Sequence, residues 1–168
     1  RGLNPNTLAA YRRDLTDISD RLAVRLEAAG AGHTLRVRGP EAGSLRGIRI
    51  DMSDIGELAP TVAAIAACAT TPSELTGIAH LRGHETDRLA ALSREINGLG
   101  GNCEELGGGL RITPTRMRGG AWRTYDDHRM AMCFSLASLL GVPVIINDPK
   151  CTHKTFPDYF QVFASLTN

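Results

Sequence analysis

The sequence lacks the features of a membrane-spanning protein or a generally basic nucleic-acid binder. Its 168 residues contain no apolar run approaching the roughly 18 residues that a membrane-spanning helix needs. Lysine and arginine total 19 against 18 aspartate and glutamate residues, so the net charge of +1 provides no overall field for nucleic acid or a membrane surface. Any affinity for anions must therefore come from the local placement of charge.

Cysteine is scarce, and its four copies are scattered without a CxxC pair. We therefore expect reduced, structural thiols, as in a cytoplasmic protein. Histidine and cysteine are never clustered at the spacing of zinc ligands, so we expect no metal site. The first 15 residues contain no apolar core of a signal peptide.

The pattern of apolar residues and glycines indicates alternating helices and strands. A run of small apolar residues over 59–69 predicts a tightly packed helix, and a glycine pair at 100–101 ends a clear amphipathic one. The remaining elements follow from the same criteria. We expect helices over 6–29, 59–69, 86–99, 126–140 and 154–168, strands over 33–39, 48–52, 74–82 and 142–148, and a hairpin over 102–114.

These elements form a crude internal repeat of strand, charged loop, apolar helix and further strands. Two of the helices are apolar on nearly every side, so they belong inside the fold rather than on its outer surface. The sequence therefore predicts an α/β protein built from repeated units with helices packed inward.

Three stretches place ionisable residues at the start of a predicted helix: "SDIGELAP", "RGHETDRL" and "YDDHRMAM". A helix N-terminus attracts anions, so Asp87, Asp126 and Asp127 suit the role of caps. Arg88 and Arg129 do not, because a cation in the first turn opposes the helix dipole. Two arginines in equivalent positions favour a shared anion site, with surface ion pairs as the alternative.

Further ionisable residues lie in the matching loops. Lys154 precedes the last predicted helix and adds a third cation. Glu57 and Glu85 would weaken anion binding, so they are either proton carriers with a tuned pKa or simple surface and capping charges. The remaining polar candidates are histidines that could contact a polar substrate, or could be incidental: His80, His84 and His128.

Four long stretches, in this order, resemble the C-terminal signatures of the 5-enolpyruvylshikimate-3-phosphate synthase family. They are "DMSDIGELAPTVAAIA" (51–66), "ELTGIAHLRGHETDRLAALS" (74–93), "YDDHRMAMCFSL" (125–136) and "DPKCTHKTFPDYF" (148–160). The resemblance runs from about residue 33 to 168. It implies a fold of βαβαββ units with buried helices, no metal and no organic cofactor. The implied reaction moves the enolpyruvyl group of phosphoenolpyruvate to the 5-hydroxyl of shikimate 3-phosphate and releases phosphate.

Roles carry over from this family by position. Arg88, Arg129 and Lys154 would hold the phosphate and carboxylate of phosphoenolpyruvate. Glu57 would contact the shikimate hydroxyls and act as base, and Glu85 would assist proton transfer at the methylene carbon. His128 would lie beside the reacting group. His80 and His84 stand where relatives have an asparagine and a lysine around the shikimate phosphate.

The resemblance also implies that this chain is one part of an active enzyme. Family members are roughly two and a half times as long, so we expect residues 33–168 to form part of the C-terminal domain and an N-terminal domain to be its structural partner. Residues 1–32 are predicted to be a helical segment of uncertain origin. Their stretch "NPNTLAAYRRDL" (4–15) resembles the start of the tyrosine recombinase core-binding domain, which keeps a small DNA-binding module open as an alternative. A related sugar-nucleotide enolpyruvyl transferase is a third option with the same fold.

Overall fold

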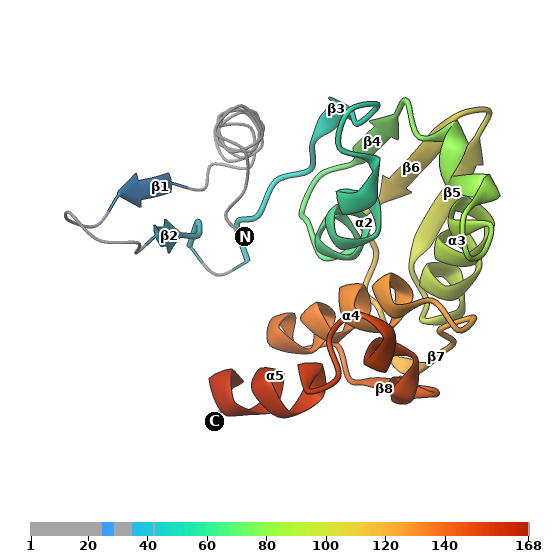
Figure 1. The fold of residues 1–168 in the computed structure, drawn as a ribbon. Helices are drawn as coiled ribbons and strands as arrows, with labels where there is room; N and C mark the ends of the chain where they lie inside the picture. The colour runs from blue at the N-terminus through green and yellow to red at the C-terminus, as the bar shows by residue number, and fades with distance from the viewer. Residues whose placement is uncertain (1–24, 29–34, 42, 168) are drawn as a thin grey trace.

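The computed structural model describes residues 25–28, 35–41 and 43–167. Within these ranges the strands form a two-stranded, a four-stranded and a second two-stranded sheet. None of the helices in the described ranges combines the length and apolar character required to cross a membrane. Two larger groups of elements lie on either side of residue 115 (Figure 1). They carry the candidate site residues that the sequence analysis singled out.

The first group is one complete βαβαββ unit. Its strands run in the order β3-β4-β6-β5, with β3 and β4 parallel and the other neighbours antiparallel. This confirms the predicted repeat. In chain order the unit consists of β3 (Arg49–Asp51), the 3-10 helix η1 (Gly56–Leu58), α2 (Ala59–Ala67), β4 (Ser73–Thr76), the 3-10 helix η2 (Ala79–Gly83), α3 (Arg88–Gly98), β5 (Asn102–Leu106) and β6 (Gly109–Thr113).

The second group repeats the first four elements of that unit. Strands β7 and β8 are parallel, as β3 and β4 are, and a helix follows each of them. Among the described residues no antiparallel hairpin joins β8. The group consists of β7 (Gly120–Trp122), α4 (His128–Ser135), the 3-10 helix η3 (Leu136–Leu140), β8 (Val144–Ile146), the 3-10 helix η4 (Pro149–Lys154) and α5 (Tyr159–Thr167).

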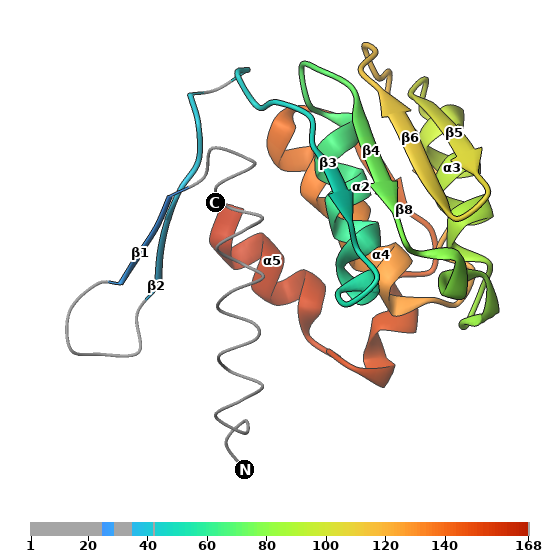
Figure 2. The same cartoon turned by 90° about the horizontal axis from the view of Figure 1, so that it is seen from above.

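Helix α2 lies inside the fold, as its small apolar residues predict. Seven of its nine residues are buried. It contacts strands β4 and β6 on one side and helices α3 and α4 on others (Figures 1 and 2). Alanine side chains let neighbouring backbones approach closely, so the sequence "APTVAAIAA" allows a helix to be enclosed by the sheet and by other helices.

A buried aromatic pair anchors α4 to its group. The rings of Trp122 and Phe134 stack with their centroids 3.8 Å apart and nearly parallel. The Trp122 Nε1–H donates to the carbonyl oxygen of Met130 at 2.8 Å, which satisfies the polar atom of a fully buried indole. Gly141 then ends the following 3-10 helix in the left-handed region with φ of 82°, as predicted from its place after the apolar run.

Four expectations about secondary structure need correction. Residues 25–28 form strand β1 (Arg25–Ala28), antiparallel to β2 (Leu35–Arg38), and not the end of a helix. The rest of the helix predicted over 6–29, and most of the segment 1–32, lie outside the described residues. The strand expected over 74–82 ends at Thr76, because Gly77 adopts φ of +74° and a Cβ there would lie 2.1 Å from the Asp51 carboxylate. Strand β7 was not predicted, and α5 begins five residues after Lys154.

All four cysteines carry free thiols, and three of them are buried. Burial raises the pKa of the Cys103 thiol to about 12 and raises that of Cys133 further. Thiols with such pKa values are poor nucleophiles at neutral pH. The expectation of structural rather than reactive cysteines agrees with this chemistry.

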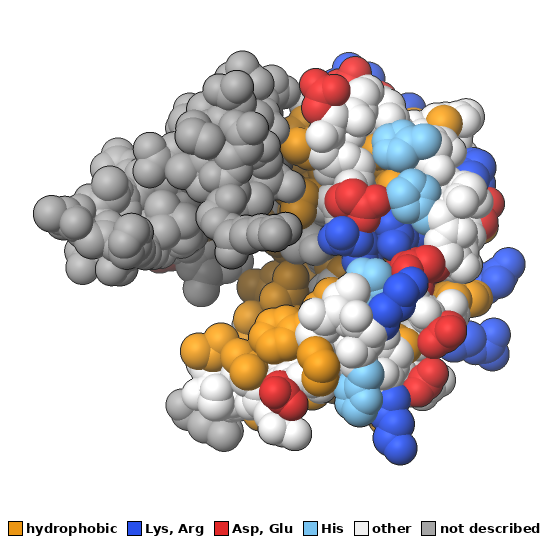
Figure 3. Space-filling model, viewed as in Figure 1, with side chains coloured by type: hydrophobic (Ala, Val, Ile, Leu, Met, Phe, Trp, Pro, Cys, Tyr) orange, Lys and Arg blue, Asp and Glu red, His pale blue; other side chains and the backbone are white. Residues whose placement is uncertain are grey.

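Exposed apolar residues are concentrated in the second group. In the structure as described, every exposed large hydrophobic side chain falls between residues 139 and 166, and hydrophobic side chains gather over α5 (Figure 3). The first group buries its apolar residues in the shared core. The exposed ones are Leu139, Leu140, Ile145, Phe156, Val162 and Leu166.

Candidate functional site: a cluster of cations and carboxylates

Most of the ionisable residues singled out in the sequence meet where three chain segments converge, and Lys154 reaches them from a fourth, η4. The 3-10 helix η1 precedes α2, the N-terminus of α3 lies beside it, and the N-terminus of α4 faces both. On the face in Figure 3, basic, acidic and histidine side chains gather around a hollow between the two groups. The interactions described below connect them into one cluster, hereafter the ion cluster. Its members are Glu57, His84, Glu85, Arg88, Asp127, His128, Arg129 and Lys154.

Asp127 is the centre of the ion cluster. Its fully buried carboxylate caps α4 by accepting from the backbone N–H of Arg129 at 2.8 Å and of Met130 at 3.4 Å. The same carboxylate accepts from Arg88, at 2.7 Å from Nε and 3.4 Å from Nη2. The predicted cap is therefore confirmed, and it has a second role that was not predicted: it orients an arginine from another helix.

Arg88 is 2% exposed, and it begins α3. Its guanidinium also donates to Glu57 and to Glu85, each at 3.2 Å. Burial acts to lower the pKa of Arg88, but the hydrogen bond and charge of Asp127, together with Glu57, outweigh it and raise the pKa overall. A buried arginine surrounded by three carboxylates stays charged at any pH the protein meets.

Arg129 joins the cluster from the first turn of α4. Its Nε lies 2.5 Å from the Glu57 carboxylate, and its Nη1 donates to the Glu57 carbonyl oxygen at 3.2 Å. Its side chain is about one-third exposed, so it is far more accessible than Arg88. Glu57 therefore bridges the two arginines that the sequence placed at equivalent helix starts.

Lys154 joins the cluster from the end of η4. Its ammonium pairs with the Glu85 carboxylate, which also contacts Arg88. The hydrogen bond from Lys154 lowers the pKa of Glu85, against a smaller opposing effect of burial, and the same bond raises the pKa of Lys154. The three predicted cations are thus joined through two carboxylates, Glu57 and Glu85.

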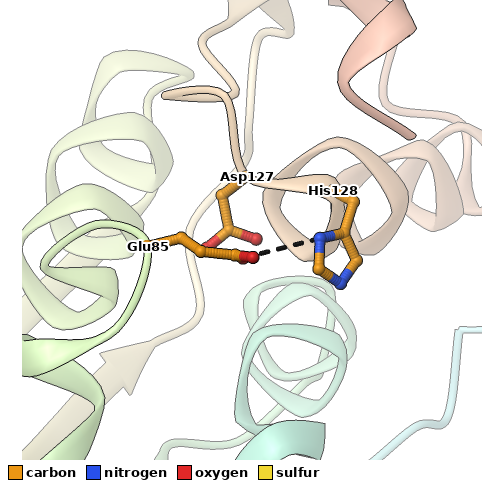
Figure 4. Close-up of side chains that lie close together, drawn as sticks. All are labelled: Glu85, Asp127 and His128. Carbon is orange, nitrogen blue, oxygen red and sulfur yellow. Dashed lines mark ion pairs between the residues drawn. The ribbon is translucent and has the colours of Figure 1, made fainter. Parts of the chain in front are cut away.

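His128 lies at the N-terminus of α4 with its Nδ1 directed at Glu85, 3.5 Å from the carboxylate (Figure 4). Among the described residues this Nδ1 is the one buried side-chain nitrogen or oxygen without a hydrogen-bond partner. The two statements agree, because 3.5 Å permits an electrostatic contact but not a well-formed hydrogen bond. An unpaired ring nitrogen at this place is available to a ligand.

Glu85, Asp127 and His128 together offer three possible metal-ligand atoms within 4.8 Å of one another. The donor set fits a metal ion poorly. The Arg88 guanidinium contacts both carboxylates, and Asp127 already accepts two backbone N–H bonds. A fixed positive charge between the carboxylates would repel a divalent cation. The geometry favours an anion at the cluster rather than a metal.

The two remaining predicted histidines lie at the edge of the cluster. The Nδ1 of His84 lies 3.3 Å from both Glu57 and the Arg88 guanidinium. His80 is exposed, with its ring centroid 5.9 Å from that of His84. A Cβ on Gly56 would come within 2.5 Å of His80 Nε2, so glycine at this position makes room for the ring beside Glu57. His80 thus borders the cluster, and no ion pair joins it to another described residue.

A pocket of about 390 Å³ opens beside Lys154 and Glu85. Sequence reasoning gave its other lining residues no place in a site, and the cap role expected for Asp126 is wrong, because Asp127 caps α4 and Asp126 lines this pocket. Tyr125 and Asp126 have φ of 55° and 57°, an unusual conformation for two consecutive residues with side chains. The doubled aspartate before the helix was the available signal of a special turn. The remaining lining residues are Lys150 and Cys151.

Solved structures show the class of fold to which this chain belongs. It matches EPSP synthase from Acinetobacter baumannii with a TM-score of 0.72 and 25% identity, over 90% of this chain and 38% of that one. It also matches the enolpyruvyl transferase NikO from Streptomyces tendae with a TM-score of 0.69 and 22% identity, over 92% of this chain and 35% of that one. The fold is therefore the α/β fold of the enolpyruvyl transferases, with inward helices.

Within that class, the family is shown by sequence. The family model described as EPSP synthase (3-phosphoshikimate 1-carboxyvinyltransferase) matches residues 1–163, so the chain belongs to this family. Curated relatives named 3-phosphoshikimate 1-carboxyvinyltransferase are 53% identical over 134 residues in Mycobacterium ulcerans and 52% identical over 142 residues in Kocuria rhizophila. These alignments cover 79% and 82% of this chain but 31% and 32% of the relatives. The chain therefore spans about a third of their length.

Proposed function

We propose that this chain is the C-terminal part of an enzyme that transfers the enolpyruvyl group of phosphoenolpyruvate to the 5-hydroxyl of shikimate 3-phosphate, releasing phosphate. The observation that carries the proposal is the ion cluster, in which Arg88, Arg129 and Lys154 converge on Glu57 and Glu85. Membership of the EPSP synthase family supports this reaction, which belongs to the shikimate pathway of aromatic amino-acid biosynthesis.

In this proposal the three cations bind the carboxylate and phosphate of phosphoenolpyruvate. In the structure Glu57 and Glu85 form ion pairs with the guanidinium and ammonium groups to which such an anion would bind. Three cations and three carboxylates, Asp127 included, make the cluster nearly neutral. The substrate must therefore displace the glutamates. It then accepts charge-assisted hydrogen bonds from the same three cations.

The displaced carboxylates become the proton carriers. Addition requires a proton on the vinyl carbon and loss of one from the attacking hydroxyl, and elimination of phosphate reverses this traffic. Glu57 takes the hydroxyl proton. Glu85 exchanges a proton with the methylene carbon, since its pKa rises once the substrate takes Lys154 away from it. His128 lies beside the reacting group, and its unpaired Nδ1 contacts the substrate there.

Shikimate 3-phosphate lies, in this proposal, on the side of Glu57 that His80 and His84 border. Glu57 contacts its hydroxyls. His84, which already contacts Arg88 at 3.3 Å, donates to the phosphate ester when protonated, and His80 contacts the same group. The chemistry needs proton transfer and charge stabilisation alone, so the proposal includes no metal and no organic cofactor.

The rest of the site is proposed to come from a partner domain. The chain spans about a third of the length of its curated relatives. Among the described residues its second group has two strands where the full unit has four, and it has exposed apolar residues on β8 and α5. We assign residues 33–168 to part of the C-terminal domain on these grounds, and the N-terminal domain is its structural partner. A cytoplasmic location stays a prediction.

Complementation tests the proposal. The part of the Mycobacterium ulcerans relative that lies outside the alignment is co-expressed with this chain, and phosphate release from both substrates is measured. We expect turnover from the mixture and none from either part alone. Arg129→Ala should lower it by roughly 10²–10³-fold, whereas Arg111→Ala should not, because Arg111 pairs with Glu74 and Glu104 on the outer face of the sheet.

A folded complex without turnover would contradict the proposal, and so would equal effects of the two arginine substitutions. The DNA-binding alternative receives no support from the comparisons. Its motif at residues 4–15 lies outside the described residues, and the EPSP synthase family model extends over that stretch. The sugar-nucleotide transferase option predicts turnover with a different acceptor, so the same assay separates it.

A further inference from the structure

Helix α3 carries a buried carboxylate outside the ion cluster. Glu95 lies on the apolar face of α3, three residues after Leu92 and four before Leu99, and it is 6% exposed. Its Oε1 accepts from the Tyr125 hydroxyl at 2.5 Å, and its Oε2 accepts from the backbone N–H of Arg123 at 3.0 Å. Both partners belong to the turn that leads into α4.

This turn is conformationally costly. Tyr125 and Asp126 are both left-handed, with φ of 55° and 57°, a conformation that is unfavourable for any residue with a side chain. A strained turn persists only where its surroundings fix it. Glu95 holds it at two points, one backbone N–H and one side-chain hydroxyl, directly before Asp127.

We propose that Glu95 is a positioning residue for the anion site: by fixing the turn 123–126 it places Asp127, and Asp127 orients Arg88 and starts the helix that carries Arg129. The inference rests on the proposed function for the identity of the anion, but its structural part does not. The path from Glu95 to the cluster uses three consecutive residues, Tyr125 to Asp127, so only a few backbone torsions separate the held turn from the Asp127 carboxylate.

The turn links Glu95 to Asp127 and, through Asp127, to Arg88 and Arg129. Asp127 bonds to Arg88 at 2.7 Å and to the backbone N–H of Arg129 at 2.8 Å. A shift of the turn therefore moves both arginines. Displacement by about 1 Å is enough to cost roughly 100-fold in catalysis, so a group that touches no substrate can govern the site.

The test uses the full 168-residue chain and four variants: Glu95→Ala, Glu95→Gln, Tyr125→Phe and, as control, Glu104→Ala. Glu104 is an exposed glutamate of β5 paired with Arg111. Two quantities are measured for each variant: the nitrogen–proton resonance of the Arg88 Nε–H, assigned with Arg88→Lys, and calorimetric binding of phosphoenolpyruvate. Thermal unfolding measures stability separately.

We expect Glu95→Ala to shift the Arg88 resonance, speed its exchange with solvent and weaken phosphoenolpyruvate binding about ten-fold, the value of one hydrogen bond to a charged group. Glu95→Gln should recover most of the affinity, because its amide oxygen still accepts from Arg123. Tyr125→Phe should be intermediate, and Glu104→Ala should match wild type in both measurements.

A folded Glu95→Ala chain with an unchanged Arg88 resonance would overturn the proposal, whatever its thermal stability. If that variant does not fold, Tyr125→Phe decides, since it removes one oxygen atom and leaves the bond to Arg123. Failure of the wild-type chain to bind phosphoenolpyruvate would count against the proposed function alone, because the Arg88 resonance tests Glu95 without any ligand.

Discussion

Helices α3 and α4 begin with the same arrangement, an aspartate cap followed by an arginine in the first turn, but the two arginines differ in burial. Arg88 is 2% exposed and held by Asp127, whereas the Arg129 side chain is 35% exposed. The two caps differ as well. Asp87 accepts from the N–H of Ala90 and pairs with nearby Arg82, while Asp127 pairs across to the other helix.

The difference separates stability from ligand binding. A buried pair such as Arg88–Asp127 is costly to break, because removal of one partner leaves the other charge buried and unpaired. The pair between Arg129 and Glu57 is partly exposed, and such pairs contribute little to stability. We therefore expect the start of α3 to stabilise the fold and orient the proposed anion site, and the start of α4 mainly to present a cation to it.

The largest effect is expected for Arg88→Ala. It should cost about 3–5 kcal/mol in free energy of unfolding, because Asp127 loses its buried partner, and it should also lower catalysis by orders of magnitude in the completed enzyme. Urea titration of the chain and phosphate release by the complemented enzyme measure the two losses. A loss of stability below 1 kcal/mol would show that Asp127 does not depend on this pair.

Arg129→Ala should separate the two properties. We expect phosphate release to fall roughly 10²–10³-fold, while the free energy of unfolding changes by no more than about 1 kcal/mol. The same assays apply, with Arg111→Ala as the matched control. Turnover close to wild type would remove Arg129 from the site, and a stability loss equal to that of Arg88→Ala would erase the contrast between the helix starts.

Asp87→Ala tests the simpler cap. Loss of the bond to Ala90 should cost about 1 kcal/mol in free energy of unfolding, and phosphate release should stay near the wild-type rate, since Asp87 contacts no member of the ion cluster through its carboxylate. Asp54→Ala, an exposed aspartate, serves as control. A large loss of turnover would mean that the start of α3 also positions the site.

The smallest effect concerns pH. The lowered pKa of Glu85 stabilises the fold above its ordinary value of 4.5, and this contribution is lost as pH falls through the lowered pKa. The raised pKa of Lys154 stabilises the fold below 10.5, and this contribution is lost as pH rises through the raised pKa. Stability of wild type and Lys154→Ala should therefore differ most between pH 4.5 and 10.5 and converge outside this window. A pH-independent difference in unfolding midpoint would contradict the pairing.

Sequence patterns predicted the unit and singled out the arginines of the ion cluster, because both predictions rest on local signals. Apolar periodicity and glycine stops gave α2, α3 and the hairpin, and the two Asp-to-Arg helix starts indicated Arg88 and Arg129. The convergence of these residues agrees with the expected shared anion site. The assignment of roles within it remains a proposal.

The sequence could not predict features that depend on the packing of distant segments. Strand β7 is three residues long and exists because it pairs with β8. The end of β4 at Thr76 depends on the approach of Asp51 to Gly77. The second role of Asp127 requires it to meet Arg88, which lies 39 residues earlier in the chain, and no local pattern encodes that contact.

The aromatic stack on β7 and α4 provides an optical probe of this region. Trp122 is the single tryptophan of the chain, is fully buried, and bonds to Met130 in the first turn of α4. Its fluorescence therefore reports whether α4 is docked, whereas circular dichroism averages over every helix. Unfolding curves from the two signals coincide if the groups on either side of residue 115 melt as one cooperative block. An earlier fluorescence transition would show that the segment carrying Arg129 opens first, at the place proposed for phosphoenolpyruvate.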